Sequence, residues 1–256
     1  MSKHSATSAT DPRRKVDAAV IEKPHTRRHR AATFQMYALL AFIVFVALAV
    51  AARFVPYFRI DLAVTRAIQL FHGPIFDRLM YEVSWVGFAP QGEIIGAVSI
   101  LALFFGGLRW EAVAASFAAF GVGFGLLIKQ LVHRPRPTGD LINVFEPLNS
   151  PSFPSGHVLT ATVFCGFFAF LVFTLVKPSV ARTVLFVGAL VFAILMGLSR
   201  IYQGQHWFSD VMGAYLLGIF WLGLTVKFYR WGKPRFFVDQ PMAPENPVRG
   251  PSSAKT

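Results

Sequence analysis

Long apolar stretches, separated by shorter polar segments, divide most of this chain. Each stretch approaches the roughly 20 apolar residues that a helix needs to cross the hydrocarbon core of a bilayer. A succession of such stretches with mostly short connections is typical of a helical membrane bundle. We therefore predict an all-α fold, an integral membrane bundle of about six transmembrane helices. The predicted spans cover residues 36–55, 84–106, 111–131, 157–176, 182–199 and 208–229.

Polar segments rich in Lys, Arg, Ser and Pro precede and follow these stretches. Such segments bury too little apolar surface to fold on their own. We expect a basic, disordered cytoplasmic tail over residues 1–32, a six-helix membrane domain over 33–230 and a second disordered cytoplasmic tail over 231–256. The first apolar stretch lies behind a polar tail, which is typical of a spanning helix rather than of a cleavable signal peptide.

The composition of the 256-residue chain agrees with a membrane location. Hydrophobic residues make up 54% of the chain and charged residues only 15%, whereas soluble domains carry about 25% charged residues. Cys165 is the only cysteine, so the chain has no internal disulfide, and its apolar surroundings indicate a packing role.

The 25 Lys and Arg residues are distributed unevenly between the two sides of the predicted bundle. Most lie in the tails and in turns on the same side, which the positive-inside rule places in the cytoplasm. We expect a multi-pass protein of the cell membrane, of the bacterial inner-membrane type, whose other side faces the periplasm or exterior. A net charge of +12 suggests nucleic-acid binding in a soluble protein, but basic tails beside a bilayer explain it without a nucleic-acid partner.

Several cations lie at the wrong side for this rule. The outer segment "IDLAVTRAIQLF" is predicted to be an amphipathic piece at the membrane interface. Lys129, Arg134, Arg136 and Arg200 follow at the outer mouths of the third and fifth spans. Snorkelling explains any one of them, but their concentration at two mouths indicates an anionic ligand.

Three polar stretches occur at these outer mouths: "KQLVHRPRPTGD" after the third span, "PSFPSGH" before the fourth, and "LSRIYQGQHWFSD" between the fifth and sixth. Packing of neighbouring helices would bring the three together. The result would be a phosphate site that contains two histidines. Its predicted members are Lys129, Arg136, Ser155, Gly156, His157, Arg200, His206 and Asp210.

Each of these residue types has a use in phosphoryl chemistry. The Lys and the two Arg side chains neutralise phosphoryl charge, while Ser155 donates a hydroxyl and Gly156 permits close approach at a helix N-terminus. His206 and Asp210 are spaced i, i+4, so on one helical face the carboxylate can orient the imidazole for attack. His157, on another helix, can protonate the leaving oxygen.

Simpler interpretations remain for the individual residues. Ser155 alone can be a helix N-cap, His206 an interfacial residue beside Trp207, and Arg200 a head-group anchor. His133 and Arg134 are expected to be surface residues rather than catalytic ones. Glu93 is expected to be interfacial or to serve packing.

The order and spacing of the polar residues resemble the type 2 phosphatidic acid phosphatase family. That family has a Lys, six residues, Arg-Pro motif, then Pro-Ser-Gly-His, then Ser-Arg, five residues, His, three residues, Asp. The three motifs match without departure over residues 129–210. The matching residues are Lys129, Arg136, Pro137, Pro154, Ser155, Gly156, His157, Ser199, Arg200, His206 and Asp210.

The resemblance implies a metal-independent phosphatase that needs no cofactor and works through a phosphohistidine. His206 would be the nucleophile, Asp210 its orienting partner and His157 the acid. Lys129, Arg136, Ser155, Gly156 and Arg200 would hold the phosphoryl group. Vanadium haloperoxidases share the pattern, but they are soluble, so the spanning stretches count against them.

The substrate is expected to be a membrane lipid phosphate, because its tail can stay in the bilayer. Undecaprenyl diphosphate, phosphatidylglycerol phosphate, phosphatidic acid, diacylglycerol diphosphate and a lipid A phosphate all fit, and the sequence leaves the oligomeric state open. One alternative is a non-catalytic lipid-phosphate binder or transporter, although anion binding needs neither a nucleophile nor an acid. The other is a basic, nucleic-acid-associated membrane protein that binds through its tails.

Overall fold

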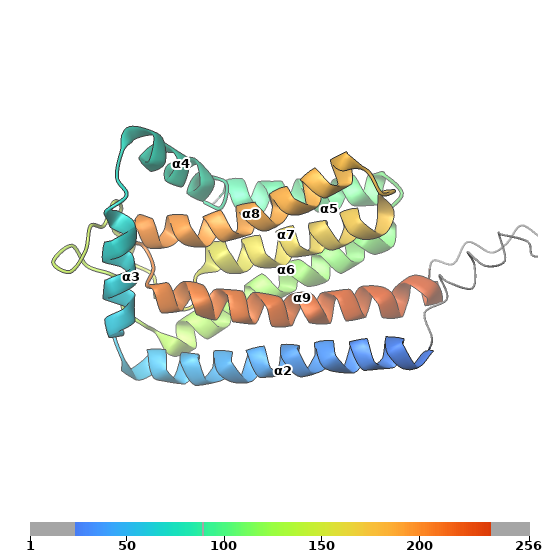
Figure 1. Ribbon diagram of the computed structural model, residues 1–256, viewed down its shortest axis with the longest axis horizontal. Helices are drawn as coiled ribbons and strands as arrows, with labels where there is room; N and C mark the ends of the chain where they lie inside the picture. Colours follow the sequence, from blue (N-terminus) through green and yellow to red (C-terminus); the bar gives the residue numbers. More distant parts are fainter. Residues whose placement is uncertain (1–23, 89, 237–256) are drawn as a thin grey trace, which may run out of the picture.

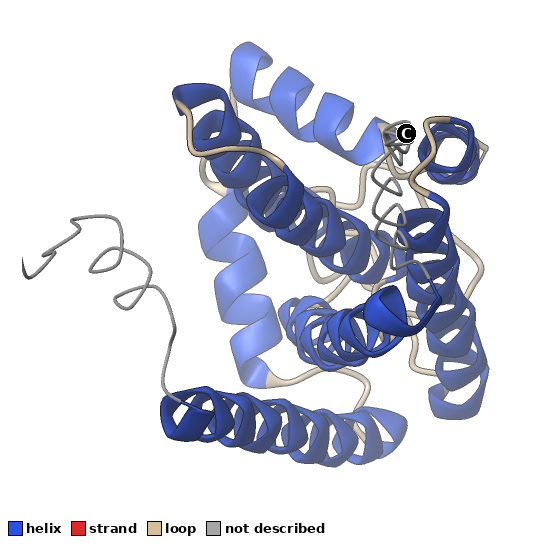
Figure 2. Ribbon diagram, turned by 90° about the vertical axis from the view of Figure 1, so that its right-hand side faces the viewer, coloured by secondary structure: helices blue, strands red, loops and turns tan. Residues whose placement is uncertain are grey.

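The computed structural model describes residues 24–88 and 90–236, with side chains from residue 36 on. Within these ranges every regular element is a helix (Figure 2). Five of the described helices are long and apolar enough to cross a bilayer, and α5 is apolar but shorter. The predicted all-α membrane bundle is therefore confirmed. The helices are α2 (Pro24–Phe54), α3 (Arg59–Gln69), α4 (Pro74–Trp85), α5 (Gln91–Phe105), α6 (Arg109–Val132), α7 (Gly156–Leu175), α8 (Val180–Tyr202) and α9 (Phe208–Phe236).

The last four predicted spans coincide with α6, α7, α8 and α9. Their predicted starts at 111, 157, 182 and 208 correspond to helix starts at Arg109, Gly156, Val180 and Phe208. Strongly apolar sequence and short connecting turns make these boundaries readable without tertiary information.

The second predicted span, 84–106, is wrong as a single helix. α4 ends at Trp85, and the 15-residue α5 begins only at Gln91. The bend contains Gly87, at which a Cβ atom would lie 2.5 Å from Cδ2 of His157. Close approach to a side chain of α7 therefore accompanies the break, and apolar content alone does not reveal it.

The predicted tails overlap the helices at both ends. α2 begins at Pro24, inside the range 1–32, and α9 continues to Phe236, beyond residue 230. Residues 1–23 and 237–256 lie outside the described residues, so for them the tails stay a prediction.

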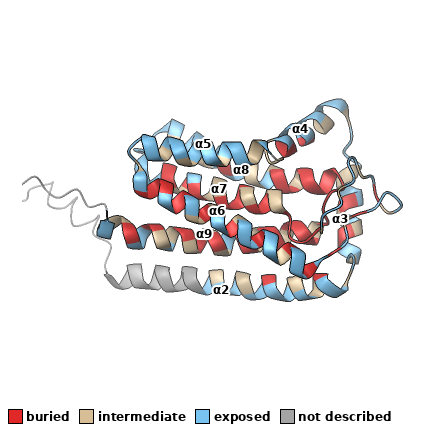
Figure 3. Cartoon of the chain, turned by 180° about the vertical axis from the view of Figure 1, so that it is seen from behind, coloured by how far each residue is buried: buried red, intermediate tan, exposed pale blue. Residues whose placement is uncertain are grey.

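Two central helices, α7 and α9, hold the bundle together. α7 packs against α6, α8 and α9, while α9 also contacts α2, and buried residues concentrate along these inner helices (Figure 3). Gly121 lets α6 approach α9 closely, because a Cβ atom there would lie 2.2 Å from Trp221. Apolar side chains of α2 and α5 cover much of the outside, as expected for a surface that faces lipid.

One end of the bundle differs from the other. The amphipathic segment predicted near residue 60 is helix α3, which lies across this end, while α2 begins and α9 ends at the opposite end (Figure 1). α3 buries Asp61 and Thr65 against the bundle and exposes Ile60. We call the end that α3 covers the α3 end.

Candidate active site

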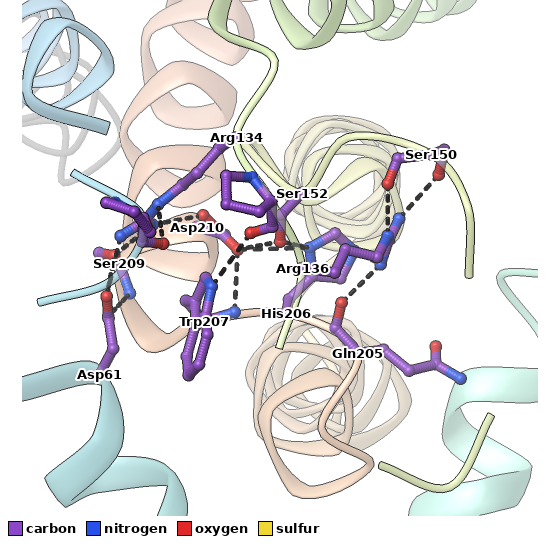
Figure 4. A network of polar contacts seen from close by, with 12 residues as sticks. Asp61, Arg134, Arg136, Ser150, Ser152, Gln205, His206, Trp207, Ser209 and Asp210 are labelled. Atoms are coloured by element: carbon purple, nitrogen blue, oxygen red, sulfur yellow. Dashed lines mark hydrogen bonds and ion pairs between the residues drawn. The ribbon is translucent and has the colours of Figure 1, made fainter. Parts of the chain in front are cut away.

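Three segments far apart in the sequence meet at the α3 end: the loop after α6, the start of α7 and the turn between α8 and α9 (Figure 4). α6 ends where His133 adopts a left-handed conformation with φ 50°. Backbone hydrogen bonds then join the segments, from Ser152 N to Arg134 O at 2.8 Å and from Ser155 N to Asp210 O at 3.3 Å. The convergence expected from the sequence is thus present in the structure.

His206 is buried in this turn with its two ring nitrogens in different surroundings. Its Nε2 lies 3.2 Å from Nη1 of Arg136. A guanidinium only donates hydrogen bonds, so Nε2 carries the lone pair and Nδ1 the proton. Burial, reinforced by the positive charges of Arg136, Lys129 and Arg200, holds the pKa of His206 well below its usual value. The ring is therefore neutral and presents its lone pair beside a cation.

Asp210 holds His206 less directly than the sequence analysis expected. α9 begins at Phe208, so His206 lies in the preceding turn rather than on the same helical face as Asp210. Nδ1 of His206 lies 3.7 Å from Oδ2 of Asp210. That oxygen also accepts a hydrogen bond from Trp207 N at 2.8 Å, as in a capping box.

Ser152 fills the gap between the two. Its hydroxyl donates to Oδ2 of Asp210 and lies 3.4 Å from Nδ1 of His206. The sequence does not reveal this role, because a serine two positions before Pro154 looks like any loop serine.

Arg134 is a second residue that sequence reasoning misplaced. It was expected at the surface, but only 1% of it is exposed. Its Nη1 donates to Oδ1 of Asp210 at 2.6 Å and its Nη2 to Oδ2 of Asp61 at 2.9 Å. A carboxylate on each side explains how the charge can be buried. His133, by contrast, is exposed as expected; Glu93 is also exposed, and its interfacial role stays a prediction.

Three further cations, Lys129, Arg136 and Arg200, lie close enough to His206 for their positive charges to act on it. Lys129 is 8% exposed and Arg200 is fully buried. Arg136 is held in place by Ser150, through O at 2.7 Å and Oγ at 2.9 Å, and by Gln205 O at 2.5 Å. Within the described residues none of the three forms an ion pair with a carboxylate. Buried positive charge without a partner favours an anionic ligand.

Several buried polar atoms beside these cations have no hydrogen-bond partner among the described residues. They are Oγ of Ser155, Nε2 of His157, and Nε and Nη2 of Arg200. Ser155 is indeed the N-cap residue of α7, but its hydroxyl makes no capping bond. At Gly156 a Cβ atom would meet no other atom within 4 Å, so the backbone there is open to close approach.

Arg200 and His157 share an aromatic support. Arg200 donates from Nη1 to Oγ of Ser84 at 3.1 Å, and its guanidinium lies 5.2 Å from the ring centre of Phe88. The His157 ring contacts the same Phe88 edge-on, with ring centres 5.1 Å apart. The bend between α4 and α5 therefore positions both side chains.

His157 also borders an apolar cavity of about 860 Å³ between α5, α7 and α8. The cavity extends from the polar site into the part of the bundle that the spanning helices form. Small side chains in the lining account for much of the cavity's width. They include Gly92, Gly96, Ala161, Gly188 and Ala189.

Comparisons with known proteins agree with this geometry. The model of the PAP2 superfamily matches residues 110–234. Phosphatidylglycerophosphatase B of Bacillus subtilis is 31% identical over 169 residues, which cover 62% of this chain and 78% of the relative.

Two crystal structures share the fold. The first is a transmembrane PAP2-type phosphatidylglycerolphosphate phosphatase from Bacillus subtilis, with a TM-score of 0.66 and 26% identity over 78% of this chain and 98% of that one. The second is LpxE from Aquifex aeolicus, with a TM-score of 0.51 and 22% identity over 66% of this chain and 96% of that one. The resemblance seen in the three motifs is therefore confirmed: this multi-span membrane protein belongs to the PAP2 superfamily of lipid phosphatases.

Proposed function

We propose that the protein hydrolyses a lipid phosphate or diphosphate at the α3 end, through a phosphohistidine formed on His206. One observation carries the proposal: His157 borders both the cationic site and the apolar cavity. A lipid phosphate has the same two-part chemistry, with an anionic head and an apolar tail. The cavity can hold the tail while the cations hold the head.

In the first step Nε2 of His206 attacks phosphorus, the N–P bond forms and the bond to the leaving oxygen breaks. The lone pair on Nε2 beside Arg136 supports this role. Lys129, Arg136 and Arg200 stabilise the charge that develops on the phosphoryl oxygens, and Ser155 adds a hydroxyl donor. His157 gives its proton to the leaving oxygen.

In the second step a water attacks the phosphohistidine. His157 takes the water's proton, the N–P bond breaks, and inorganic phosphate leaves. Asp210, reached through Ser152, keeps the proton of His206 on Nδ1 throughout. Each proton given out in the first half is recovered in the second.

Phosphatidylglycerol phosphate is the first substrate to test, because two relatives carry its phosphatase in their names. Purified protein would be incubated with this lipid, phosphatidic acid and undecaprenyl diphosphate, and phosphate release measured with and without excess chelator. We expect metal-independent release from at least one lipid, since three cations already neutralise the phosphoryl group. A labelled phosphoenzyme stable to base and labile to acid would identify the histidine intermediate. No release from any lipid would favour the alternative of a non-catalytic binder or transporter.

We also propose that the α3 end faces the periplasm or exterior, in a membrane of the bacterial inner type. Arg109 begins α6, Lys177 lies between α7 and α8, and Lys233 lies near the end of α9. These helix ends lie opposite the α3 end (Figure 1), and their cations support a cytoplasmic location there. Replacing Cys165 by alanine gives a background for single-cysteine labelling. A membrane-impermeant reagent should label Asp140→Cys and miss Ser253→Cys, and the opposite pattern would reverse the orientation.

A further inference from the structure

A buried cluster of ions lies beside His206, on the side away from Arg136 (Figure 4). It joins Asp61 of α3, Arg134 of the loop after α6 and Asp210 of α9. The side chains of all three have no exposed surface. Arg134 occupies an unspecified position inside the first motif and Asp61 lies outside all three, so the roles of the motif residues do not account for them.

Each of the three side-chain nitrogens of Arg134 already donates to a protein group. Its Nε donates to Pro56 O at 3.1 Å, Nη1 to Ser209 Oγ at 2.7 Å and to Asp210, and Nη2 to Asp61. The guanidinium also lies 4.9 Å from the ring centre of Phe58. A side chain fixed on all sides in this way cannot reorient toward a phosphoryl group. Its contact with the reaction runs through Asp210 alone.

We propose that Arg134 is a positioning residue that holds Asp210 in the orientation His206 needs. The proposal rests on the proposed function, in which Asp210 keeps the proton of His206 on Nδ1. Arg134 binds Oδ1 of Asp210, which leaves Oδ2 to accept from Ser152 and Trp207 on the side of His206. With one oxygen anchored, the plane of the carboxylate is set.

Charge supports the same assignment. A buried carboxylate is strongly destabilised unless a cation pairs with it. Arg134 is the cation that forms this pair with Asp210 within the described residues. Lys129, Arg136 and Arg200 are thereby left unpaired for the phosphoryl group.

Asp61 links Arg134 to helix α3. Its Oδ1 accepts from Ser209 N at 2.8 Å and its Oδ2 from Ser209 Oγ at 2.9 Å, at the first turn of α9. It also accepts from Phe58 N at 2.8 Å, at the start of its own helix. Asp61 thus fixes Arg134 to the same turn that carries Asp210. The orientation of Asp210 depends on α3 being seated on the bundle.

The test compares Arg134→Gln with the double variant Asp61→Asn/Arg134→Gln. The single variant leaves Asp61 and Asp210 buried without their cation, so both stability and kcat should fall. The double variant removes the charge stranded on Asp61 and should regain thermal stability. Its kcat should nevertheless stay about 10- to 100-fold below wild type, the loss typical when a side chain that orients a metal ligand is removed, which we take as the scale for orienting Asp210. KM and inhibition by inorganic phosphate should stay unchanged, because the three binding cations are untouched.

Lys233→Gln is the matched control for simple destabilisation. At the opposite end of the bundle Lys233 pairs with the fully buried Glu111 at 2.7 Å, so this variant also strands a buried carboxylate. It should lose thermal stability and keep kcat. Arg134→Lys, which keeps the charge but not the geometry, should fall between wild type and Arg134→Gln.

Recovery of wild-type kcat in the double variant would overturn the proposal, since Arg134 would then serve only to neutralise Asp61. A fall in kcat equal to that of Lys233→Gln would overturn it as well. If Arg134→Gln cannot be purified, the double variant alone decides, because it removes Arg134 without stranding Asp61. A wild-type protein that releases no phosphate from any lipid would contradict the proposed function instead, so the two failures are distinguishable.

Discussion

Ser152 and Ser155 lie three positions apart in one loop, and both are fully buried, yet their hydroxyls differ in their hydrogen bonding. The hydroxyl of Ser152 bonds Asp210 and lies near Nδ1 of His206. The hydroxyl of Ser155 has no partner among the described residues. The difference divides the site into a closed half, in which polar atoms are bonded to protein, and an open half, in which they are not. The closed half contains Asp61, Arg134, Ser152 and Asp210. The open half contains Ser155, His157 and Arg200, and we group with it Lys129 and Arg136, which also form no ion pair with a carboxylate among the described residues.

The two halves have different energetic consequences. A buried polar atom without a partner costs about 1–3 kcal/mol, so the open half lowers the stability of the free protein. A ligand with several acceptor oxygens would remove that cost, which fits the proposed phosphoryl group. The closed half carries no such cost and serves as a fixed frame. His206 joins the halves, since Nδ1 faces Ser152 and Nε2 lies beside Arg136.

The largest effect is expected from removing the group that joins the halves. His206→Ala should abolish turnover, a loss of at least about 10³-fold, as for other nucleophiles that act within a catalytic unit. The folded variant should still bind inorganic phosphate or vanadate, because the cations of the open half remain. Phosphate release from purified, monodisperse protein gives the first value and equilibrium binding the second. Substantial residual turnover would remove His206 from the role of nucleophile.

Within the open half, His157 should matter in proportion to the leaving group. A lipid alkoxide is strongly basic and needs a proton, whereas a phosphate that leaves from a diphosphate needs one less, since acid catalysis follows Brønsted behaviour. We expect His157→Ala to lower the phosphorylation rate about 10²- to 10⁴-fold with phosphatidic acid, and to lower it less with a diphosphate lipid. Single-turnover phosphorylation must be measured, because the later attack by water is common to both substrates.

His206→Ala is the control, and its phosphorylation rate should fall by the same factor with both substrates. Equal losses for His157→Ala would instead indicate that His157 binds the phosphoryl group or shapes the turn.

The open half could be predicted from the sequence, whereas in the closed half only Asp210 could. Lys129, Arg136 and Arg200 were conspicuous because cations at the outer mouths of apolar spans need a ligand. The same reasoning failed for Arg134, because its counter-charge Asp61 lies in another helix, 73 positions away. Ser152 gave no signal at all, since its role exists only once Asp210 and His206 are in place.

The fold shows a similar division. Runs that stay apolar over a full span predicted α6, α7, α8 and α9, because their length is set by the bilayer rather than by neighbours. The bend between α4 and α5 was missed, because residues 84–106 are apolar on both sides of it and the close approach of Gly87 to His157 that accompanies the break is a tertiary contact. Positions set by tertiary contact are not encoded in local hydropathy.

Alanine substitutions of Ser152 and Ser155 test directly whether the site divides into a closed and an open half. Ser155→Ala should leave thermal stability unchanged or raised, since it removes a hydroxyl that the protein does not bond. It should lower kcat/KM about 10- to 100-fold, the value of a hydrogen bond to a charged group. Ser152→Ala should do the reverse, with a loss of about 1 kcal/mol of stability and only a several-fold fall in kcat, because His206 can close on Asp210. Melting curves and kinetics on the same preparations measure both, and similar behaviour of the two variants would abolish the division into halves.

The smallest effect concerns the charge that the open half places beside His206. Burial and nearby cations hold the pKa of His206 well below 6.5 in the free protein, so acidification from neutral pH should leave the nucleophile unprotonated. Because the pKa of His206 is lowered, its neutral, reactive form persists to lower pH. The acid limb of kcat/KM, which reports the free enzyme, should therefore lie at a pH below the ordinary pKa of histidine.

Arg136→Gln removes one of the cations beside His206, so the pKa of His206 should rise and the acid limb should move to higher pH. The move should stay below about one unit, since burial, the larger cause, remains. Arg136→Lys keeps the charge and should leave the limb in place. Ionisation of the lipid phosphate is the same for all three proteins, so only the difference between their profiles counts. A limb at one common pH in all three would show that the cations of the open half do not act on His206.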